Sequence, residues 1–381
     1  MLDPREQLAS VATGRLPEIV RLALGAPDAA LGQWSAVPLQ GGIGASDPTR
    51  ALFLLQGMAD TGAAQRSWSL VLRLRAPVAD RDDPAHIGYW QREALLYSSG
   101  LLAGLPAGLS VPRCYGCDTA ADGVVRLWLE HVQEDGAASW PLTRWALAAR
   151  HLGRFNGAYL SGRPLPRAPW LGWRLRTWVA QHEPLVARIA AAPRNPDVRQ
   201  WWPQPVVDAI LRLWAERDVF CTALEALPPT FGHGDAIRRN LLARRGAEGE
   251  DETVAIDWEF AGYYAAGEEV GQTLSVAAAF FDVEPFTLPA LDEALFTSYL
   301  AGLRDMGWQG DSRAVRFAYA AHAALRNAFN AVGTTVPDSA RRLATQQNYG
   351  HTWEELAGRR AALRPFLLER ADEARRLLGS L

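Results

Sequence analysis

Apolar residues recur with two different periods along the chain, and the change from one to the other divides it. Before residue 133 they form short runs, partly alternating with polar residues, which is typical of strands. Such runs occupy residues 34–39, 51–55, 68–75 and 124–132. After Ser139 the apolar residues mostly recur at helical spacing. We therefore expect two domains, residues 1–132 with a sheet and residues 133–381 mostly helical, with a polar boundary after the last strand.

Two helices are also expected in the first part. Residues 1–24 carry apolar side chains at mixed helical spacing. Asp83 followed by Pro84 is a typical helix start, and Gly100 is a typical helix end, so a second helix is predicted over residues 83–100. Within it, Glu93 has aromatic and aliphatic residues three to four positions away on both sides, which places its carboxylate on the apolar face.

A strand pattern returns once in the second part. Residues 241–243 and 254–256 are apolar, and the segment between them is charged and contains glycine, which predicts a β-hairpin. Asn240 stands where the first strand begins and Asp257 where the second ends, so the hairpin brings them together. Asp235 lies five residues before Asn240. One base and two oxygen ligands for Mg²⁺ are what phosphoryl transfer requires. Asp, Asn and Gly are also common in turns, but the ordered set favours a site.

The motif His233-Gly-Asp235, four residues, Asn240, followed by Asp257-Trp-Glu259, resembles the aminoglycoside phosphotransferase and choline kinase family of the protein-kinase-like superfamily. That family carries His-Gly-Asp where protein kinases carry His-Arg-Asp. The resemblance, which covers roughly residues 35–275, implies an α+β bilobal protein-kinase-like fold with a small antiparallel-sheet N-lobe and a mostly helical C-lobe. It implies that Asp235 is the catalytic base and that Asn240 and Asp257 bind magnesium.

The same resemblance suggests nucleotide-binding positions in the first part. Gly41, Gly42 and Gly44 would form a turn whose backbone amides approach the nucleotide phosphates, although glycine-rich hairpins are common without such a role. The strand over residues 124–132 would be the hinge between lobes. Backbone groups around Glu130 to Val132 would then read the adenine edge, and an ordinary edge strand is the alternative.

One departure from the family concerns the phosphate-binding lysine. The chain contains no lysine, so all 39 basic residues are arginine, and Arg73 stands at the matching strand position. Arginine keeps the charge and can bind phosphate in a bidentate manner, but it is longer and planar. Because a buried carboxylate requires a partner, Glu93 is expected to pair with Arg73. Arg75 is the rival for the role, and a helix-surface Glu93 is the alternative.

The region after the hairpin contributes support and, as one option, substrate contacts. Glu268 or Glu269 stands where the family usually has Asp, and a structural role is expected. Beyond residue 272 the pattern is helical and includes acids and aromatics that could hold a substrate ammonium, which makes a cationic acceptor one hypothesis. Core packing is the other. These residues are Phe280, Phe281, Asp282, Glu284, Trp308, Tyr349 and Trp353.

Composition excludes several classes of partner. A net charge of −3 gives no reason to expect nucleic acid or an anionic membrane surface. No basic segment with an apolar core opens the chain and no apolar run is long enough to cross a bilayer, so a cytoplasmic protein is expected. Cys114, Cys117 and Cys221 are too few for a disulfide framework and are interpreted as ordinary thiols. The oligomeric state is left open.

The sequence therefore predicts an enzyme that transfers the γ-phosphate of Mg²⁺-bound ATP or GTP to a hydroxyl of a small molecule. Antibiotics, amino alcohols, hydroxy amino acids and sugars are all compatible acceptors. A nucleotide-binding pseudokinase with a regulatory or scaffolding role is the alternative, because the usual lysine is missing. A protein kinase is disfavoured, since Asp257-Trp-Glu259 replaces Asp-Phe-Gly and no Ala-Pro-Glu segment follows.

Overall fold

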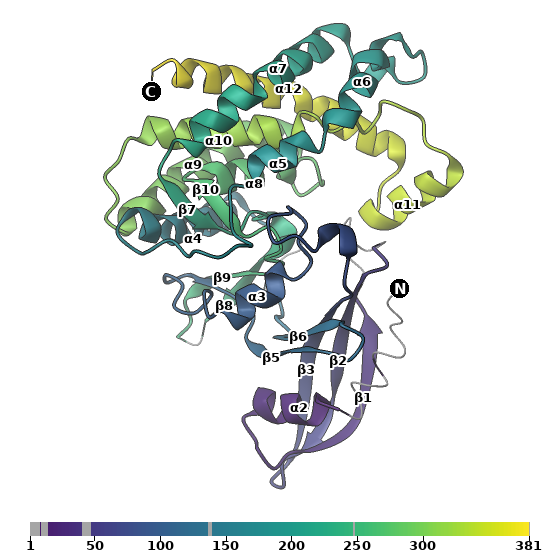
Figure 1. Cartoon of the computed structure of the whole chain (residues 1–381), viewed down its shortest axis with the longest axis vertical. Helices are drawn as coiled ribbons and strands as arrows, with labels where there is room; N and C mark the ends of the chain where they lie inside the picture. The colour runs from purple at the N-terminus through teal and green to yellow at the C-terminus, as the bar shows by residue number, and fades with distance from the viewer. Residues whose placement is uncertain (1–7, 9–13, 40–46, 136–138, 247, 381) are drawn as a thin grey trace. The chain divides into compact units, whose positions relative to one another are not determined.

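The computed structural model describes the chain except residues 1–7, 9–13, 40–46, 136–138, 247 and 381. The chain folds into two compact units (Figure 1). The N-terminal unit comprises residues 1–103 and 111–134, and the C-terminal unit comprises residues 104–110 and 135–381. The predicted boundary after residue 132 lies two residues before this division, and the excursion of residues 104–110 into the second unit was not predicted.

The N-terminal unit is built on a five-stranded antiparallel sheet of order β1-β2-β3-β6-β5. Its strands are β1 Ala30–Pro38, β2 Arg50–Asp60, β3 Gln65–Arg75, β5 Cys114–Thr119 and β6 Val125–Glu130. The four expected strands are therefore present, and β5 is an additional one. Sequence alternation explains the burial, because Leu70, Leu72 and Leu74 all lie on one face of β3 and are fully buried.

Helix α2, Leu16–Leu24, covers that buried face. It begins with Pro17 in its first turn and ends at Gly25, which has the left-handed conformation typical of a helix C-terminus. Leu16, Ile19 and Val20 form one hydrophobic core with the leucines of the sheet. This is the leading helix predicted within residues 1–24, as far as the described residues extend.

Of the helix predicted over residues 83–100, only the second half is present. Helix α3 spans Arg92–Ser98, whereas the segment from Asp83 to Gln91 forms turns. The Asp83 side chain accepts a hydrogen bond from the Ala85 N–H at 2.9 Å, which closes a local turn instead of capping a helix. The buried Arg92 guanidinium then donates to the carbonyls of Ile87 and His86, both at 2.6 Å, and so satisfies the turn backbone.

The C-terminal unit is mostly helical. Its helices are α4 Leu142–Leu160, α5 Leu175–Ala180, α6 Glu183–Ala191, α7 Gln204–Glu225, α8 Glu268–Ala277, α9 Leu288–Asp305, α10 Ser312–Asn327, α11 Ser339–Tyr349 and α12 Trp353–Leu378. Short 3₁₀ helices are η2 Ala79–Arg81 in the first unit and η3 Ala192–Arg194, η4 Arg199–Trp201, η5 Arg238–Asn240 and η6 Pro285–Thr287 in the second. Residues of α5, α7, α10 and α12 form its main hydrophobic core, which contains Trp202 and Phe317.

Two small sheets interrupt the helices and carry the predicted motif. Strands β7 Pro229–Gly232 and β10 Gly262–Ala265 pair antiparallel. Strands β8 Leu241–Arg245 and β9 Asp251–Ala255 form the predicted hairpin, to which β4 Leu109–Ser110 adds a parallel strand. The structure thus confirms the α+β fold class, with an antiparallel sheet in the first unit and a helical second unit.

Candidate active site

The candidate catalytic loop follows β7 and leads into the hairpin. Its tight course depends on Gly234, which lies at φ +77°. A Cβ atom at this position would lie 2.2 Å from the Tyr264 hydroxyl and 2.3 Å from the Phe260 carbonyl oxygen, so only glycine fits. The loop therefore reaches Asp235 in close contact with β10 and the segment that precedes it.

Among the described residues, three side chains donate hydrogen bonds to the Asp235 carboxylate. Asn240 Nδ2 binds Oδ2 at 2.8 Å, Gln272 Nε2 binds Oδ1 at 2.6 Å, and Arg326 Nη2 binds Oδ1 at 3.2 Å. The carboxylate is 17% exposed. Because ionised carboxylate oxygens offer about four acceptor positions, these donors orient Asp235 and leave Oδ2 with room for one more donor, such as a substrate hydroxyl.

His233 holds the loop to the end of β9. Its Nδ1 accepts from the Asp235 N–H at 3.1 Å, and its Nε2 lies 2.8 Å from the Ile256 carbonyl oxygen. Only the neutral tautomer with a proton on Nε2 satisfies both contacts. Burial lowers the pKa of His233 to about 4, which agrees with that tautomer. His233 therefore orders the loop by hydrogen bonding.

Glu269, in the first turn of α8, fixes the same loop from the other side. It accepts from the backbone N–H groups of His233 at 2.5 Å and Gly234 at 3.3 Å, and from Asn156 Nδ2 at 2.8 Å. Burial raises the pKa of Glu269 to about 7 against the effect of these hydrogen bonds. Its neighbour Glu268 accepts from the Ala265 N–H at 2.7 Å. Both acids therefore have the structural role expected of this position.

The two predicted metal ligands flank the open end of the hairpin. Leu241 pairs with Ala255, and the Ile256 N–H donates to the Asn240 carbonyl at 2.9 Å, so Asn240 and Asp257 lie beside the first ladder pair. The Asn240 Nδ2 group faces two Asp235 oxygens, which leaves Oδ1 as the outward acceptor. Asp257 lies at φ +64°, a strained conformation for a residue with a side chain and one that recurs at functional sites.

The N-terminal unit contains the expected ion pair. Arg73 Nη1 lies 2.8 Å from both carboxylate oxygens of Glu93, whose side chain is only 4% exposed. Strand alternation turns Arg73 away from the leucine face of β3. Arg75, on the same face, is buried at the end of the strand. The pairing expected from the position of Glu93 in its helix is therefore present.

The remaining nucleotide-binding predictions have different outcomes. Gly41, Gly42 and Gly44 lie outside the described residues. Glu130 ends β6, and its N–H donates to the Arg113 carbonyl at 2.8 Å while its carboxylate accepts from the Arg113 N–H at 3.0 Å. The Glu130 N–H is therefore engaged in a hydrogen bond within the protein and does not point to an adenine contact. Val132 follows the strand in an irregular segment.

A sequence profile of the phosphotransferase enzyme family matches residues 63–309. The chain belongs to this family. The match spans β3, Glu93, the catalytic loop and the hairpin. It therefore includes the predicted Arg73–Glu93 pair and the predicted residues Asp235, Asn240 and Asp257. A comparison with curated protein sequences gave no match. Membership in the phosphotransferase enzyme family makes the chain an enzyme of the kinase type and confirms the resemblance stated from the motifs.

Solved structures show the same fold at low sequence identity. An amicoumacin kinase, hAmiN, in complex with AMP-PNP, Ca²⁺ and Ami, is 13% identical with a TM-score of 0.53, covering 96% of each chain. A microcompartment-associated aminopropanol kinase is 16% identical with a TM-score of 0.54, covering 96% of this chain and 98% of the other. An aminoglycoside phosphotransferase from Alicyclobacillus acidocaldarius is 15% identical with a TM-score of 0.50, covering 94% and 96%. All three support the kinase-like fold.

This member of the phosphotransferase family has two site residues that the motif analysis missed. Gln272 and Arg326 both contact Asp235, although they lie 37 and 91 residues after it. The Arg326 guanidinium also stacks on Trp178, 3.3 Å from the ring centroid. Gln272 is a buried polar residue between Val270 and Leu274 in α8, and no local motif marked it. No local pattern linked Arg326, at the end of an alanine-rich helix, to the loop.

Other predicted features have structural roles. Cys114 and Cys117 are half-buried and Cys221 is buried, all as free thiols, as expected. Trp178, Trp201 and Trp214 pack against the main core of the second unit. Among the helices of the described residues, none has the length and apolar character needed to cross a membrane.

The pH profile of turnover is expected to show the ionisation of Asp235. Burial raises the pKa of Asp235 to about 6; the charges of Asp257 and Glu259 add to this, and the Arg326 guanidinium opposes it. Because a base must be deprotonated, kcat/KM should rise about tenfold between pH 5 and pH 7 and then level off. Arg326→Met should move the rise to higher pH. A profile that is flat across this range, or unmoved by the substitution, would contradict the assignment.

Proposed function

We propose that the protein is a small-molecule kinase that transfers the γ-phosphate of Mg²⁺-bound ATP or GTP to a hydroxyl group. The observation that carries this proposal is the Asp235 carboxylate, held by three donors in a loop fixed by His233 and Glu269, within the region that matches the phosphotransferase family. In this position Asp235 orients the acceptor hydroxyl through Oδ2 and accepts its proton as the oxygen attacks phosphorus.

The donor set at the hairpin suits magnesium. Asn240 presents a carboxamide oxygen because its nitrogen is committed to Asp235. Asp257 supplies a carboxylate from the end of the paired strand, close enough for its charge to act on Asp235. Hard oxygen ligands of this kind are the ones that Mg²⁺ takes in phosphoryl-transfer sites, where few protein ligands are combined with phosphate oxygens and water. When bound, the ion neutralises charge that develops on the phosphate oxygens. Asn240 and Asp257 would hold it in this protein.

The nucleotide contacts are proposed for the N-terminal unit. Arg73, held by Glu93, supplies the cation for the nucleotide phosphates in place of the usual lysine. The planar guanidinium can bind two phosphate oxygens at once, provided that the phosphates lie farther from β3 than a lysine would require. Gly41, Gly42 and Gly44 would approach the phosphates through backbone amides, and the segment from Glu130 to Val132 would contact the base.

Arg73→Ala should raise KM for Mg·ATP and lower kcat/KM by roughly 10- to 100-fold, because one charge-assisted contact is worth about 1.5–3 kcal/mol. Arg75→Ala is the matched control, two residues along the same strand face, and should change these values far less. Steady-state kinetics at varied ATP, together with nucleotide binding by calorimetry, provide the measurement. The reverse order of effects would move the phosphate contact to Arg75.

The proposed activity is tested by mass spectrometry. Mg·ATP and Mg·GTP are offered with a panel of hydroxyl-bearing antibiotics, amino alcohols, hydroxy acids, nucleosides and sugars, and Asp235→Asn serves as the control. A product that gains one phosphate with the wild type and not with the variant supports the proposal and names the acceptor class. Magnesium-dependent nucleotide binding without transfer to any acceptor would favour a pseudokinase, and absence of binding would contradict both.

A further inference from the structure

A cluster of arginines beside Asp235 is not used by the proposed reaction. Arg360 in α12 and Arg239 in the catalytic loop both contact the ring of Phe280. Their guanidinium carbons are 5.2 Å and 4.7 Å from its ring centroid. Both aromatic contacts are cation–π interactions, so the face of Phe280 that could have received a substrate ammonium is already occupied by protein cations. Arg359 likewise lies over Phe281, at 4.4 Å.

Arg360 and Arg239 are each connected to the candidate base through hydrogen bonds and adjacent residues of the chain. On one side, Arg326 binds Asp235, and its neighbour Asn327 accepts a hydrogen bond from Arg360 at 3.4 Å. On the other side, Arg239 directly precedes Asn240, which binds Asp235. Phe280 joins the two branches between Arg360 and Arg239. The arginine pair therefore lies in the same part of the C-terminal unit as the Asp235 carboxylate.

Among the described residues, neither Arg360 nor Arg239 is hydrogen-bonded to a carboxylate. Arg360 is only 4% exposed, yet its Nε has no hydrogen-bond acceptor and its one hydrogen bond, to Asn327, is long. Neither Arg360 nor Arg239 forms an ion pair in that part of the chain. Asp282 interacts electrostatically with Arg239 and Arg238 without an ion pair, burial raises its pKa to about 6, and one of its oxygens has no donor. Buried charges without such compensation are costly.

Other arginines of the unit, half-buried or buried, show how the chain normally compensates the cost of removing a charge from water. Arg316 and Arg370 share the carboxylates of Asp292 and Glu373. Arg364, one turn after Arg360 in α12, donates to the carbonyls of Trp201 and Val332 at 2.8 Å and 3.1 Å and stacks on Trp202. Arg364 is therefore a structural residue. Arg360 has no carboxylate partner among the described residues, and its other contacts are a long hydrogen bond to Asn327 and the distant ring of Phe280. This points to a ligand that supplies the missing negative charge.

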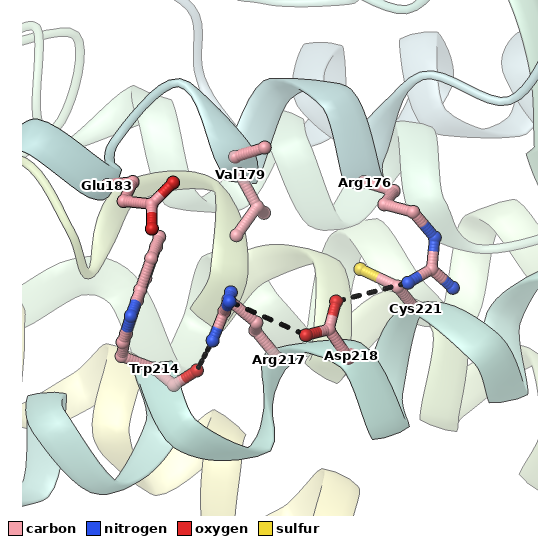
Figure 2. Close-up of a pocket in the computed structure, with 8 residues that line it drawn as sticks. Arg176, Val179, Glu183, Trp214, Arg217, Asp218 and Cys221 are labelled. Carbon is pink, nitrogen blue, oxygen red and sulfur yellow. Dashed lines mark hydrogen bonds and ion pairs between the residues drawn. The ribbon is translucent and has the colours of Figure 1, made fainter.

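A pocket elsewhere in the unit does not have this property. It is lined by residues of α5, α6 and α7, and in Figure 2 Asp218 is joined to both Arg176 and Arg217. Arg176 binds Asp218 at 3.1 Å, and Arg217 lies 3.5 Å from the same carboxylate and donates to the Trp214 carbonyl at 2.8 Å. Its cations need no external anion.

We infer that the acceptor is an anionic hydroxyl compound, a hydroxy acid or a phosphate ester, whose negative group binds Arg360 and Arg239 while its hydroxyl meets Asp235. This inference rests on the proposed kinase function and names its substrate class. Planar guanidinium groups bind carboxylate and phosphate oxygens in the same way. The two arginines therefore indicate a negatively charged group, which either a carboxylate or a phosphate would provide. Arg326, bound to Asp235, shields the arriving anion from the charge of the base.

The test uses compounds that differ mainly in charge. The probes are 3-hydroxypropanoate, 3-hydroxypropanamide and 3-aminopropan-1-ol, with glycerol 3-phosphate and glycerol added to separate phosphate from carboxylate. We expect that, of these probes, only the anionic compounds raise the Tm of the protein. We also expect their kcat/KM for phosphorylation to be higher than that of the neutral and cationic compounds. Arg360→Met and Arg239→Met should each raise the KM for the anionic acceptor roughly 10- to 100-fold, and leave the KM for Mg·ATP within about twofold.

Arg359→Gln is the matched control, because Arg359 is the adjacent residue of α12 and is paired with Glu284 at 2.9 Å. It should leave the response to anions unchanged. Arg239 is half-buried, so Arg239→Met decides the question if Arg360→Met does not fold. If none of the probes is phosphorylated, the Tm response decides: stabilisation by anions that both methionine variants lose supports the inference, and no anion-specific stabilisation overturns it.

The inference and the proposed function fail in different ways. Preference for 3-aminopropan-1-ol, or equal use of the three charge forms, with transfer that depends on Asp235, would overturn the anionic acceptor and keep the kinase. An anion response that is the same in wild type and in both variants would also overturn it. Loss of all Mg·ATP binding and of every Asp235-dependent transfer would instead contradict the kinase function.

Discussion

Replacing Asp235 with Asn is expected to lower kcat by roughly 10²- to 10⁴-fold, the range associated with loss of a positioned general base. Asn keeps the shape of the side chain, and its oxygen can still accept from Gln272 and Arg326. It cannot take up the acceptor proton, and its amide nitrogen would face the Asn240 donor. The measurement is steady-state phosphoryl transfer, with Mg·ATP affinity determined separately by calorimetry and expected to change little.

Folding stability separates this catalytic loss from a structural one. Burial raises the pKa of Asp235 from 3.8 to about 6, so the folded state binds this proton more tightly than the unfolded chain. The stabilisation from that proton is present at low pH and is lost as the pH rises through about 6. At pH 8 the Asn variant avoids the buried charge, and its Tm should equal or exceed that of the wild type. A lower Tm together with weaker nucleotide binding would show that Asp235 mainly supports the fold.

The catalytic hairpin was predictable from the sequence because its signals are local. Two apolar runs separated by a charged, glycine-bearing turn determined the strands, and strand pairing then placed Asn240 next to the segment that leads to Asp257. The ion pair of Arg73 and Glu93 was also predictable from the sequence. Strand periodicity predicted the face of Arg73, and helix periodicity predicted the face of Glu93. In both cases one short-range rule was sufficient.

The features that were missed depend on competition or on distance along the chain. Asp83 has the sequence of a helix cap, but its side chain binds the N–H two residues on, and this turn replaces the first half of the predicted helix. Gln272 and Arg326 reach Asp235 only because α8 and α10 pack together beside the loop. Aromatic residues suggested a site for a cation, whereas tertiary packing put arginines on Phe280 and Phe281. No local pattern specifies such partners.

Gly234→Ala is expected to disrupt the catalytic loop more than any other single methyl group added at the site. The left-handed backbone at φ +77° costs a residue with a Cβ about 1–2 kcal/mol. The new Cβ would also meet the Phe260 carbonyl at 2.3 Å and the Tyr264 hydroxyl at 2.2 Å, and overpacking of this kind adds about 1–3 kcal/mol. We therefore expect a loss of roughly 2–5 kcal/mol in urea unfolding. A displacement of Asp235 by about 1 Å would lower kcat about 100-fold.

Gly249→Ala provides the matched control for backbone strain. Gly249 lies at φ +86° in the turn of the β8–β9 hairpin, and a Cβ there would have no neighbour within 4 Å. This variant should lose about 1–2 kcal/mol of stability through strain alone and retain wild-type kcat. The difference between the two variants measures the close packing of the loop against Phe260 and Tyr264. Equal losses of stability, with kcat preserved in both, would mean that the loop accommodates the methyl group and that its tight course does not position Asp235.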